Sequence, residues 1–508
     1  MTPQVATAQD LTDPADRRLF RFLEMLPGLV SWLTIFLAIL LSWQRPFLVA
    51  VFILAFDLYW LFRALYFSFH LHAGFRKMEE YKKIDWFSRV KQINDWQKIY
   101  HLCLFTLCDE PWEIVQESFR SLEKSDYPRE KMIVVLSAEE RTGQEILDKV
   151  QEKFSQSFFK LLITRHPFGR PGEIPGKGSN DRWAEIRAKK EIIDPLKIPH
   201  QNVIASFFDV DSVVFPKHFS CLTWHYLTCL KPERTSFQPI PLFINNIWEA
   251  PFISRTAALA STFWNTLSQE RPEKLITFSS HAMSFKTLVE VGFKQANVVS
   301  DDSRIFWQSF LHFNGDYQTQ SLYYPMAMDA NAVPSFWRTL KNIYKQQRRW
   351  AYGCDEIPYV FFHFFKDKKI SLFKKLSCAL FIFEAHWSWA TNSLLIFLLG
   401  WLPLILGGPN FSQQLLAYNL PNITSRLMTL AMIGLLASIY LGFKLMPTRP
   451  LETKKTGLPF FLVFIIEWLV LPLTMFFFWT LPGLDAQTRL VLGRYLGFWH
   501  TEKHRKSQ

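Results

Sequence analysis

The chain has 508 residues, of which 49% are hydrophobic, 16% are aromatic and 20% are charged. It is too long for one ordinary core, too apolar for a typical soluble protein and too charged for a protein that lies wholly in a membrane. The formal net charge is +12, and Lys and Arg cluster beside apolar runs at residues 76–83 and 366–375. Such clusters are typical of cytoplasmic loops, and no nucleic-acid module is recognisable, so we expect no nucleic acid as a partner.

The N-terminal region is predicted to anchor the chain in a membrane. Residues 1–25 begin with a polar stretch rich in Asp and Arg, which argues against a cleaved signal peptide. The apolar segments 26–43 and 47–67 each approach the length of about 20 residues that spans a bilayer, and a short polar break separates them. We therefore expect a transmembrane hairpin over residues 26–68.

Residues 69–335 lack any long uncharged segment and are predicted to form a soluble α/β domain. Apolar runs at 99–107, 131–138 and 202–208 indicate buried strands, and a helical pattern covers 112–123. Alternating strands and helices favour right-handed crossovers and a mostly parallel sheet, with ligands at the carboxyl ends of the strands. The six cysteines show no zinc-type spacing, so we regard them as reduced thiols without an assigned role.

The C-terminal part is predicted to return to the membrane. Residues 336–375 are interpreted as interfacial helices, and about three spans are expected within 376–482, at 376–406, 427–445 and 458–481. Residues 483–508 form the C-terminal segment. Five spans in total put the termini on opposite sides of the membrane, although the basic end of the chain is typical of the cytosolic side. The sequence leaves this conflict open.

Asp209-Val210-Asp211 places two carboxylates directly after the third predicted strand. At the carboxyl edge of a sheet, such a pair suits a hard divalent cation such as Mg or Mn, which neutralises charge on a diphosphate. Two acids in a turn are as often a solvated loop or a helix cap, so the motif alone favours neither interpretation.

The acidic pair Asp301-Asp302 follows a short apolar stretch and precedes a helical pattern at 305–313. One carboxylate at this point is suited to act as a general base toward an acceptor hydroxyl. Taken alone, the pair favours a helix N-cap instead, because acids are common where helices start.

The segment Gln346-Gln347-Arg348-Arg349-Trp350 is basic and aromatic and lies shortly before the membrane returns. Arg and Gln bind diphosphate oxygens, and Trp stacks on a sugar face. An interfacial helix has the same composition, since Trp and Arg concentrate at membrane surfaces. Both interpretations can hold for one helix.

In this order and spacing, the three motifs resemble those of the family 2 glycosyltransferases of the cellulose, hyaluronan and chitin synthase type. The resemblance extends from about residue 99 to the last apolar segment. It implies a GT-A nucleotide-sugar domain inserted between transmembrane helices, an inverting mechanism and a requirement for Mg or Mn. It also implies residue roles: Asp209 and Asp211 contact the metal and diphosphate, Asp302 is the catalytic base, and Gln346, Arg349 and Trp350 hold the diphosphate and the acceptor end.

Further segments resemble the nucleotide site of that family less closely. Asp109 and Glu110 stand where the family has an Asn-Glu turn near the nucleotide base, and Lys177 and Asn180 match its Lys-x-x-Asn element. After the second strand the family has an Asp for the uracil or ribose, whereas this chain has Glu139. The resemblance implies a UDP-sugar, and the departure at Glu139 puts the identity of the nucleotide in doubt.

The resemblance implies a multi-pass protein of the cell membrane whose cytosolic domain moves a hexose from a nucleotide sugar to a saccharide or lipid-linked acceptor. Synthesis and export of a polysaccharide, and transfer of a single sugar to a lipid carrier, share every motif. A transporter or receptor whose soluble domain binds nucleotides without catalysis is a further alternative. The sequence does not indicate the sugar, the linkage or any partner subunit.

Overall fold

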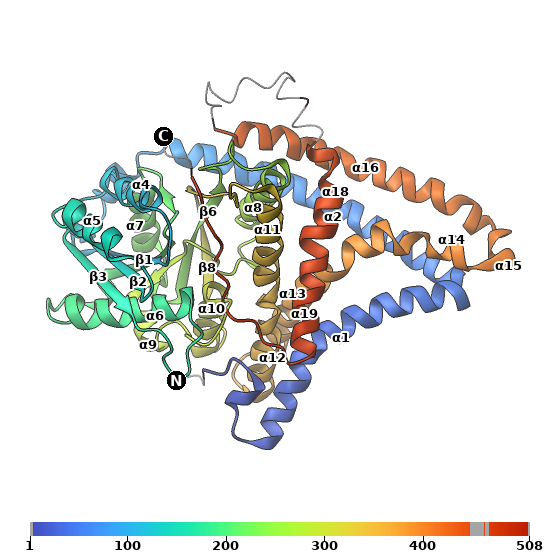
Figure 1. Cartoon of the computed structure of the whole chain (residues 1–508), viewed down its shortest axis with the longest axis horizontal. Helices are drawn as coiled ribbons and strands as arrows, with labels where there is room; N and C mark the ends of the chain where they lie inside the picture. Colours follow the sequence, from blue (N-terminus) through green and yellow to red (C-terminus); the bar gives the residue numbers. More distant parts are fainter. Residues whose placement is uncertain (1–3, 448–461, 463–466, 506–508) are drawn as a thin grey trace.

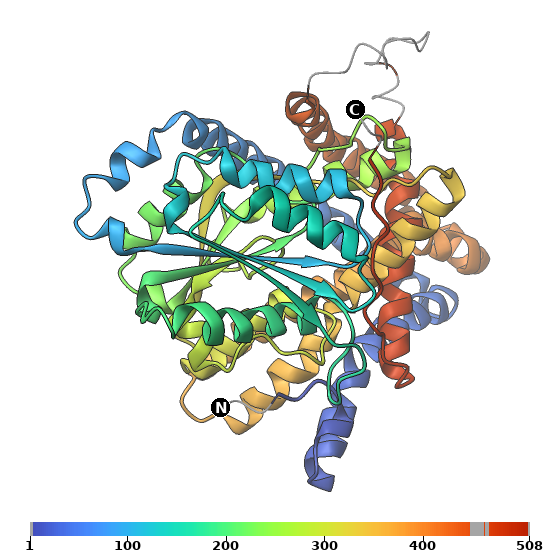
Figure 2. The same cartoon turned by 60° about the vertical axis from the view of Figure 1, so that its left-hand side comes forward.

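The computed structural model of the chain describes residues 4–447, 462 and 467–505. An α/β domain built on one eight-stranded sheet lies at one end, and long helices extend from it toward the other (Figure 1). Turned by 60°, the sheet is seen between layers of helices on its two faces (Figure 2). The predicted α/β domain is therefore confirmed.

Four parallel strands form the first half of the sheet, in the order β3-β2-β1-β4. β1, β2 and β4 are mainly apolar runs that are buried on both faces, as central parallel strands require, whereas β3 lies at the edge of the sheet and is only partly buried. All four end at the same edge, and Thr106 of β1 lies opposite Asp209 of β4. The strands are β1 Tyr100–Leu107, β2 Met132–Glu139, β3 Lys160–His166 and β4 Val203–Asp209, with helices α4 Trp112–Glu123, α5 Gln144–Phe154 and α6 Lys177–Ala188.

The second half of the sheet is mixed, so the prediction of a mostly parallel sheet holds only for the first half. Strand β7 runs antiparallel to both β4 and β6, β8 runs parallel to β6, and β5 runs antiparallel to β8. β5 has two residues and β7 has three, so neither strand is long enough to show an apolar pattern in the sequence. The strands are β5 Val213–Val214, β6 Thr235–Phe243, β7 Ala282–Ser284 and β8 Gln318–Met328.

Further helices pack around the sheet or connect its strands: α3 Trp86–Val90, α7 His218–Thr228, α8 Phe252–Ser268, α9 Phe285–Glu290 and α10 Asp301–His312. Beyond the last strand, α11 Phe336–Ala351 and α12 Glu356–Lys366 pack mainly against the long helices of the elongated part.

Two long helices at the N-terminus form the predicted hairpin: α1 Pro14–Gln44 and α2 Pro46–Lys83. Asp13 begins α1, because its carboxylate accepts the backbone N–H groups of Ala15 and Asp16 at 2.9 and 2.8 Å. Pro46 cannot continue α1 but suits the first turn of α2, so the chain reverses there. Among the described residues, both helices are long and apolar enough to cross a membrane.

The C-terminal helices complete the elongated part. They are α13 Leu372–Phe397, α14 Leu402–Leu406, α15 Gly408–Ser412, α16 Leu415–Leu445, α18 Leu471–Met475 and α19 Leu481–Val491. Helix α13 bends by 47° into the segment that ends at α14, and this bent pair is long and apolar enough for one span. Helix α16 packs along α2.

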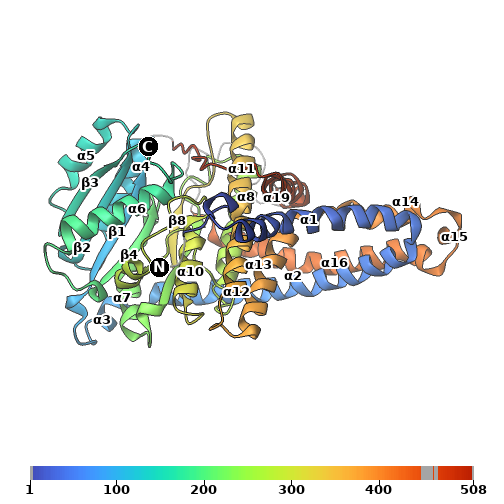
Figure 3. The ribbon, with the colours of Figure 1, turned by 90° about the horizontal axis from the view of Figure 1, so that it is seen from below.

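The last predicted span, 458–481, falls partly outside the described residues, at 458–461 and 463–466. The helical chain that follows, through α18 and α19, runs across the hairpin rather than along it (Figures 1 and 3). α19 packs against α1, α11 and α13. Beyond it, residues 492–505, here called the C-terminal tail, have no regular secondary structure and run back along the α/β domain.

Candidate functional site

The carboxyl edge of the parallel strands gathers most of the residues singled out from the sequence. Asp209 ends β4 and Asp211 follows it, Glu139 ends β2, and residues 108–111, here called the β1 loop, follow β1. Because all these strands run in one direction, segments far apart in the chain place their acids at one edge.

Asp209 and Asp211 point into the domain and do not form a solvated loop. The Ser279 hydroxyl donates to Asp209 Oδ2 at 2.8 Å. Asp211 is only 2% exposed; its Oδ2 accepts the backbone N–H of Asp329 at 3.2 Å, and its Oδ1 lies 2.6 Å from Lys503 Nζ. A cation thus already contacts Asp211, and two carboxylates in this setting fit a hard divalent cation such as Mg²⁺ or Mn²⁺.

Asp302 lies in the first turn of α10, as expected for an acid at a helix start. The same position also places its carboxylate among the charged residues of the site. Its Oδ1 accepts from Lys177 Nζ at 2.8 Å and from Lys294 Nζ at 2.7 Å. Burial opposes ionisation of this carboxyl, but the two ammonium groups outweigh it and hold the pKa of Asp302 well below its usual range. Asp302 is therefore ionised at neutral pH.

Asp302 belongs to a buried group of charges, here called the lysine–carboxylate cluster: Lys177, Lys294, Asp181, Asp301 and Asp302. Lys294 is fully buried and also contacts Asp181 at 2.8 Å and Asp301 at 2.9 Å. The lysines offset the desolvation of the acids, and the acids raise the pKa of Lys294 despite its burial. Gly178 permits this arrangement, because a Cβ there would lie 2.8 Å from Cβ of Asp301.

The Gln-x-x-Arg-Trp segment lies on α11 and faces the same edge. Gln346 and Trp350 line a cavity together with Phe243, Asp329 and Asn331. Asn331 Nδ2 donates to Gln346 Oε1 at 3.4 Å. Burial lowers the pKa of Arg349, and the nearby charges of Asp209 and Asp302 only partly offset this effect.

Arg349 is also the best placed cation to receive an anion. Among the described residues its Nε has no hydrogen-bond partner, and its guanidinium lies 4.6 Å from the centre of the Phe498 ring. A buried guanidinium donor without an acceptor is a strained state that a diphosphate oxygen relieves.

The residues that match the family less closely, Asn180, Lys177 and Glu139, do not all lie at the sheet edge. Asn180 is buried, and its amide donates to the backbone oxygen of Ser137 at 2.9 Å, so it holds α6 on β2 and does not face the edge. Lys177 faces Asp302 at the site. Glu139 remains at the edge, pairs with Arg141 at 2.9 Å and lines a second cavity.

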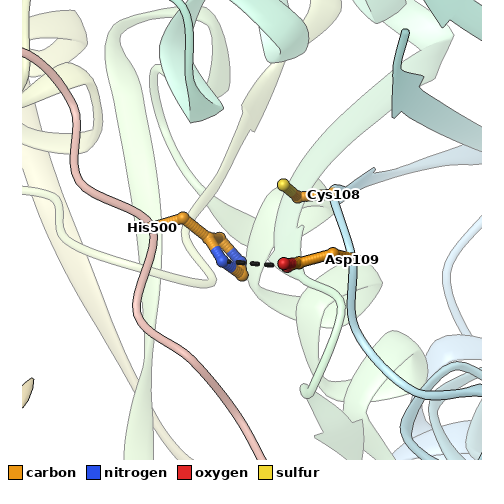
Figure 4. Close-up of side chains that lie close together, drawn as sticks. All are labelled: Cys108, Asp109 and His500. Atoms are coloured by element: carbon orange, nitrogen blue, oxygen red, sulfur yellow. Dashed lines mark ion pairs between the residues drawn. The ribbon is translucent and has the colours of Figure 1, made fainter. Parts of the chain in front are cut away.

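The C-terminal tail lies over this edge, a position that was not predicted from the sequence. His500 Nδ1 lies 3.1 Å from Asp109 (Figure 4). Its Nε2 lies 2.9 Å from Glu110. Burial disfavours the charged imidazole, but hydrogen bonds to these two acids raise the pKa of His500 to about 9. Further along, Lys503 pairs with Asp211, and Arg505 Nε donates to Asp329 at 3.0 Å.

Three features of the site escaped the sequence reasoning: Lys294, Ser279 and the tail. No motif marks the first two, and each is recognisable only through its contact with an acid far away in the chain, Asp181 for Lys294 and Asp209 for Ser279. The tail carries a visible signal, because His500, Lys503 and Arg505 are spaced along a short basic segment after an aromatic pair. From the sequence alone, that pattern indicates only the side of the membrane on which the segment lies.

No protein-family model and no curated relative matches this chain. Among solved structures, it is similar to the mannosyltransferase PcManGT from Pyrobaculum calidifontis, solved with GDP-Man and Mn²⁺, at 13% identity and a TM-score of 0.42. That match covers 76% of this chain and 99% of the other. TarS from S. aureus matches at 10% identity and a TM-score of 0.36, over 66% of this chain and 54% of its own.

GalNAc-T7, solved with UDP, GalNAc and Mn²⁺, matches at 11% identity and a TM-score of 0.35, over 57% of this chain and 58% of its own. The first of the three is a glycosyltransferase by name. At this level of similarity they do not determine the function of this chain, which is argued below from its own residues.

Proposed function

We propose that the chain is an inverting, metal-dependent glycosyltransferase that takes a sugar from a nucleotide-diphosphate donor, a UDP-sugar by its motifs. The observation that carries the proposal is the meeting of Asp209, Asp211, Asp302 and Arg349 at one sheet edge, from segments far apart in the chain. Transfer from a sugar diphosphate needs this combination of a metal site, an anion site and an ionised carboxylate.

The geometry supports a distinct role for each residue. Asp209 and Asp211 hold the metal, which when bound neutralises charge on the diphosphate that leaves. Arg349 contacts diphosphate oxygens with its unpartnered donor. Asp302 accepts the proton of the acceptor hydroxyl as that oxygen attacks the anomeric carbon, and the new bond forms on the face opposite the departing diphosphate.

The acceptor side is assigned to the cavity at α11, which at about 20 Å³ has to widen before it admits a sugar. Trp350 and Phe243 line it, with ring centres 6.1 Å apart, and Gln346 and Asn331 supply polar groups. An aromatic wall with a few amides is a suitable lining for a sugar, whose faces are apolar and whose edges carry hydroxyls. The acceptor is proposed to be a saccharide or a lipid-linked sugar at the membrane surface.

We place the protein in the cell membrane with its α/β domain in the cytosol. Among the described residues, the two helices of the hairpin and the bent α13–α14 pair are long and apolar enough to be spans. We assign α16, which packs along α2, as a fourth crossing, while α18 and α19 lie across these helices. Both ends of the described chain support this arrangement, since Arg304 of the α/β domain donates to the backbone oxygen of Val5 at 3.2 Å and the tail contacts Asp211. With both termini in the cytosol, the basic C-terminal segment lies on the side that its charge favours, which five crossings would not allow.

The proposal is tested by diphosphate release from the purified full chain in nanodiscs. A panel of UDP-, GDP-, ADP- and CDP-sugars is supplied with Mg²⁺, with Mn²⁺ or with EDTA, together with membrane lipid and oligosaccharide acceptors. We expect release from one donor class, only with metal. Donor binding without any release would favour the non-catalytic nucleotide-binding alternative.

Product length then separates the two enzymatic alternatives. A ladder or a long product from labelled donor supports processive synthesis, whereas a product that gains one sugar and stays lipid-soluble supports transfer to a lipid carrier. Both outcomes retain the same edge residues.

A further inference from the structure

Three potential metal ligands of different chemistry meet where the C-terminal tail crosses the β1 loop (Figure 4). Cys108 and Asp109 follow β1, and His500 comes from the tail. The Cys108 sulfur, an Asp109 carboxylate oxygen and a His500 ring nitrogen all lie within 4.8 Å of one another. We propose that these side chains bind a borderline divalent cation such as Zn²⁺, which fastens the tail to the β1 loop.

The ligand set selects the class of metal. A thiolate, an imidazole and a carboxylate are the three ligand types that Zn²⁺ accepts together, whereas Mg²⁺ and Ca²⁺ take oxygen ligands. Metal–ligand bonds of about 2.0–2.3 Å put the ligands of a tetrahedral site roughly 3.3–3.8 Å apart. Side-chain rotations that contract the group by about 1 Å therefore close it around a cation and leave the fourth position for water.

A second carboxylate orients the imidazole. Glu110 Oε1 lies 2.9 Å from His500 Nε2, and Nδ1 on the other side of the ring faces Asp109 at 3.1 Å. Glu110 is itself held by the backbone N–H of Cys108, which donates to its Oε2 at 2.9 Å. A ligand histidine whose other nitrogen donates to a carboxylate is the usual arrangement in protein metal sites, because it fixes the ring.

The local charge balance also admits a cation. Three acids, Asp109, Glu110 and Glu139, outnumber the two cations Arg141 and His500 at this point. Arg141 Nη2 lies 2.6 Å from the Cys108 sulfur and competes for it, but its side chain is 61% exposed and keeps Glu139 as a partner when it turns away. The metal displaces the Cys108 proton, which goes to solvent.

The tail links this site to the acids at the sheet edge. Lys503 lies three residues beyond His500 in the sequence and contacts Asp211 at 2.6 Å. A cation that fixes His500 keeps Lys503 on Asp211, so zinc should reduce donor turnover; this consequence rests on the proposed function. Metal binding itself does not rest on it and is measured without any nucleotide.

Cobalt absorption tests the site directly on the full chain, purified in detergent and freed of metal with EDTA. We expect titration with Co²⁺ at pH 8 to give a near-ultraviolet thiolate-to-cobalt band that saturates at a single equivalent and is abolished by Zn²⁺. Cys108→Ser and His500→Ala should each lose the band. The matched controls Cys229→Ser and His504→Ala, a thiol elsewhere and a neighbouring tail histidine, should keep it. Absence of the band from the wild type, or its survival in Cys108→Ser, would overturn the proposal.

Limited trypsin digestion then tests whether the metal fastens the tail. Zn²⁺ should slow cleavage within residues 494–505 at least about tenfold in the wild type, which is roughly 1.4 kcal/mol, and leave His500→Ala unchanged. Equal cleavage with and without Zn²⁺ would overturn the fastening. If zinc binds and protects the tail but no sugar donor is turned over, the proposed function fails while this site stands.

Discussion

The charged groups around the sheet edge fall into two sets with different partners. Acids of the lysine–carboxylate cluster pair with Lys177 and Lys294, which belong to the same domain and are buried with them. The acids at the edge, Asp109, Glu110, Asp211 and Asp329, pair with cations of the C-terminal tail. One set is therefore built into the domain core, and the other depends on a terminal segment without regular structure.

The cations of the lysine–carboxylate cluster are therefore preorganised, whereas the cations that pair with the edge acids can be exchanged. A buried carboxylate that loses its only cation is costly, so the lysines around Asp302 must stay in place as the domain works. The edge acids need a cation too, but a divalent metal ion supplies positive charge to them as well as Lys503 and Arg505 do. Under the proposed function, a carboxylate with fixed cations therefore lies beside two carboxylates whose cations are replaceable.

The largest expected effect comes from a substitution in the lysine–carboxylate cluster. Asp302→Asn should lower the rate of diphosphate release by about 100- to 10,000-fold, because the amide cannot accept a proton. Nucleotide affinity, measured by calorimetry, should change little. Asp316→Asn, an acid that pairs with Lys231 and Arg234 far from the edge, is the matched control. A wild-type rate in Asp302→Asn would show that this carboxylate is no base.

Next comes the metal position. Asp211→Asn should weaken Mn²⁺ binding on the order of 100-fold, about 2.7 kcal/mol, because one of two carboxylate ligands is lost. Electron paramagnetic resonance of free Mn²⁺ measures the affinity. The edge interpretation would be contradicted if Asp211→Asn bound Mn²⁺ as the wild type does.

Removal of the competing cation should act in the opposite direction. Lys503→Ala is expected to tighten Mn²⁺ binding by about 5- to 10-fold, since a partly buried ion pair at Asp211 no longer has to break. Arg494→Ala, a basic residue at the start of the tail, serves as control. Weaker Mn²⁺ binding in Lys503→Ala would mean that Lys503 assists the metal and does not compete with it.

These contacts show where sequence reasoning succeeds and where it stops. Apolar runs revealed β1, β2 and β4 but not the edge strand β3, and the family resemblance, not any local pattern, grouped Asp209, Asp302 and Arg349. Strands β5 and β7 are too short to leave a pattern, and the pairing of Lys294 with Asp181 joins residues 113 positions apart, which no local pattern encodes. Asn180 fits a motif, yet its amide serves the backbone of β2.

The smallest expected effect concerns pH. The lysines keep the pKa of Asp302 below the ordinary pKa of an aspartate. The carboxylate is therefore fully ionised at any pH above that ordinary pKa, and it becomes protonated only when the pH falls through the lowered pKa. Lys177→Met should raise that pKa and move the acidic limb of the kcat profile toward neutral pH. An unchanged acidic limb, with kcat measured between pH 4 and 8, would show that Lys177 does not control the protonation of Asp302.

The central claim is that Asp209 and Asp211 form a metal site which the tail covers until the donor binds. A crystal structure of the full chain with Mn²⁺ and the nucleoside diphosphate that binds best tests it most directly, through the anomalous scattering of manganese. We predict a peak beside Asp209 and Asp211, with Lys503 no longer in contact with Asp211. A nucleotide bound elsewhere, with no peak at these carboxylates and Lys503 still on Asp211, would contradict the account.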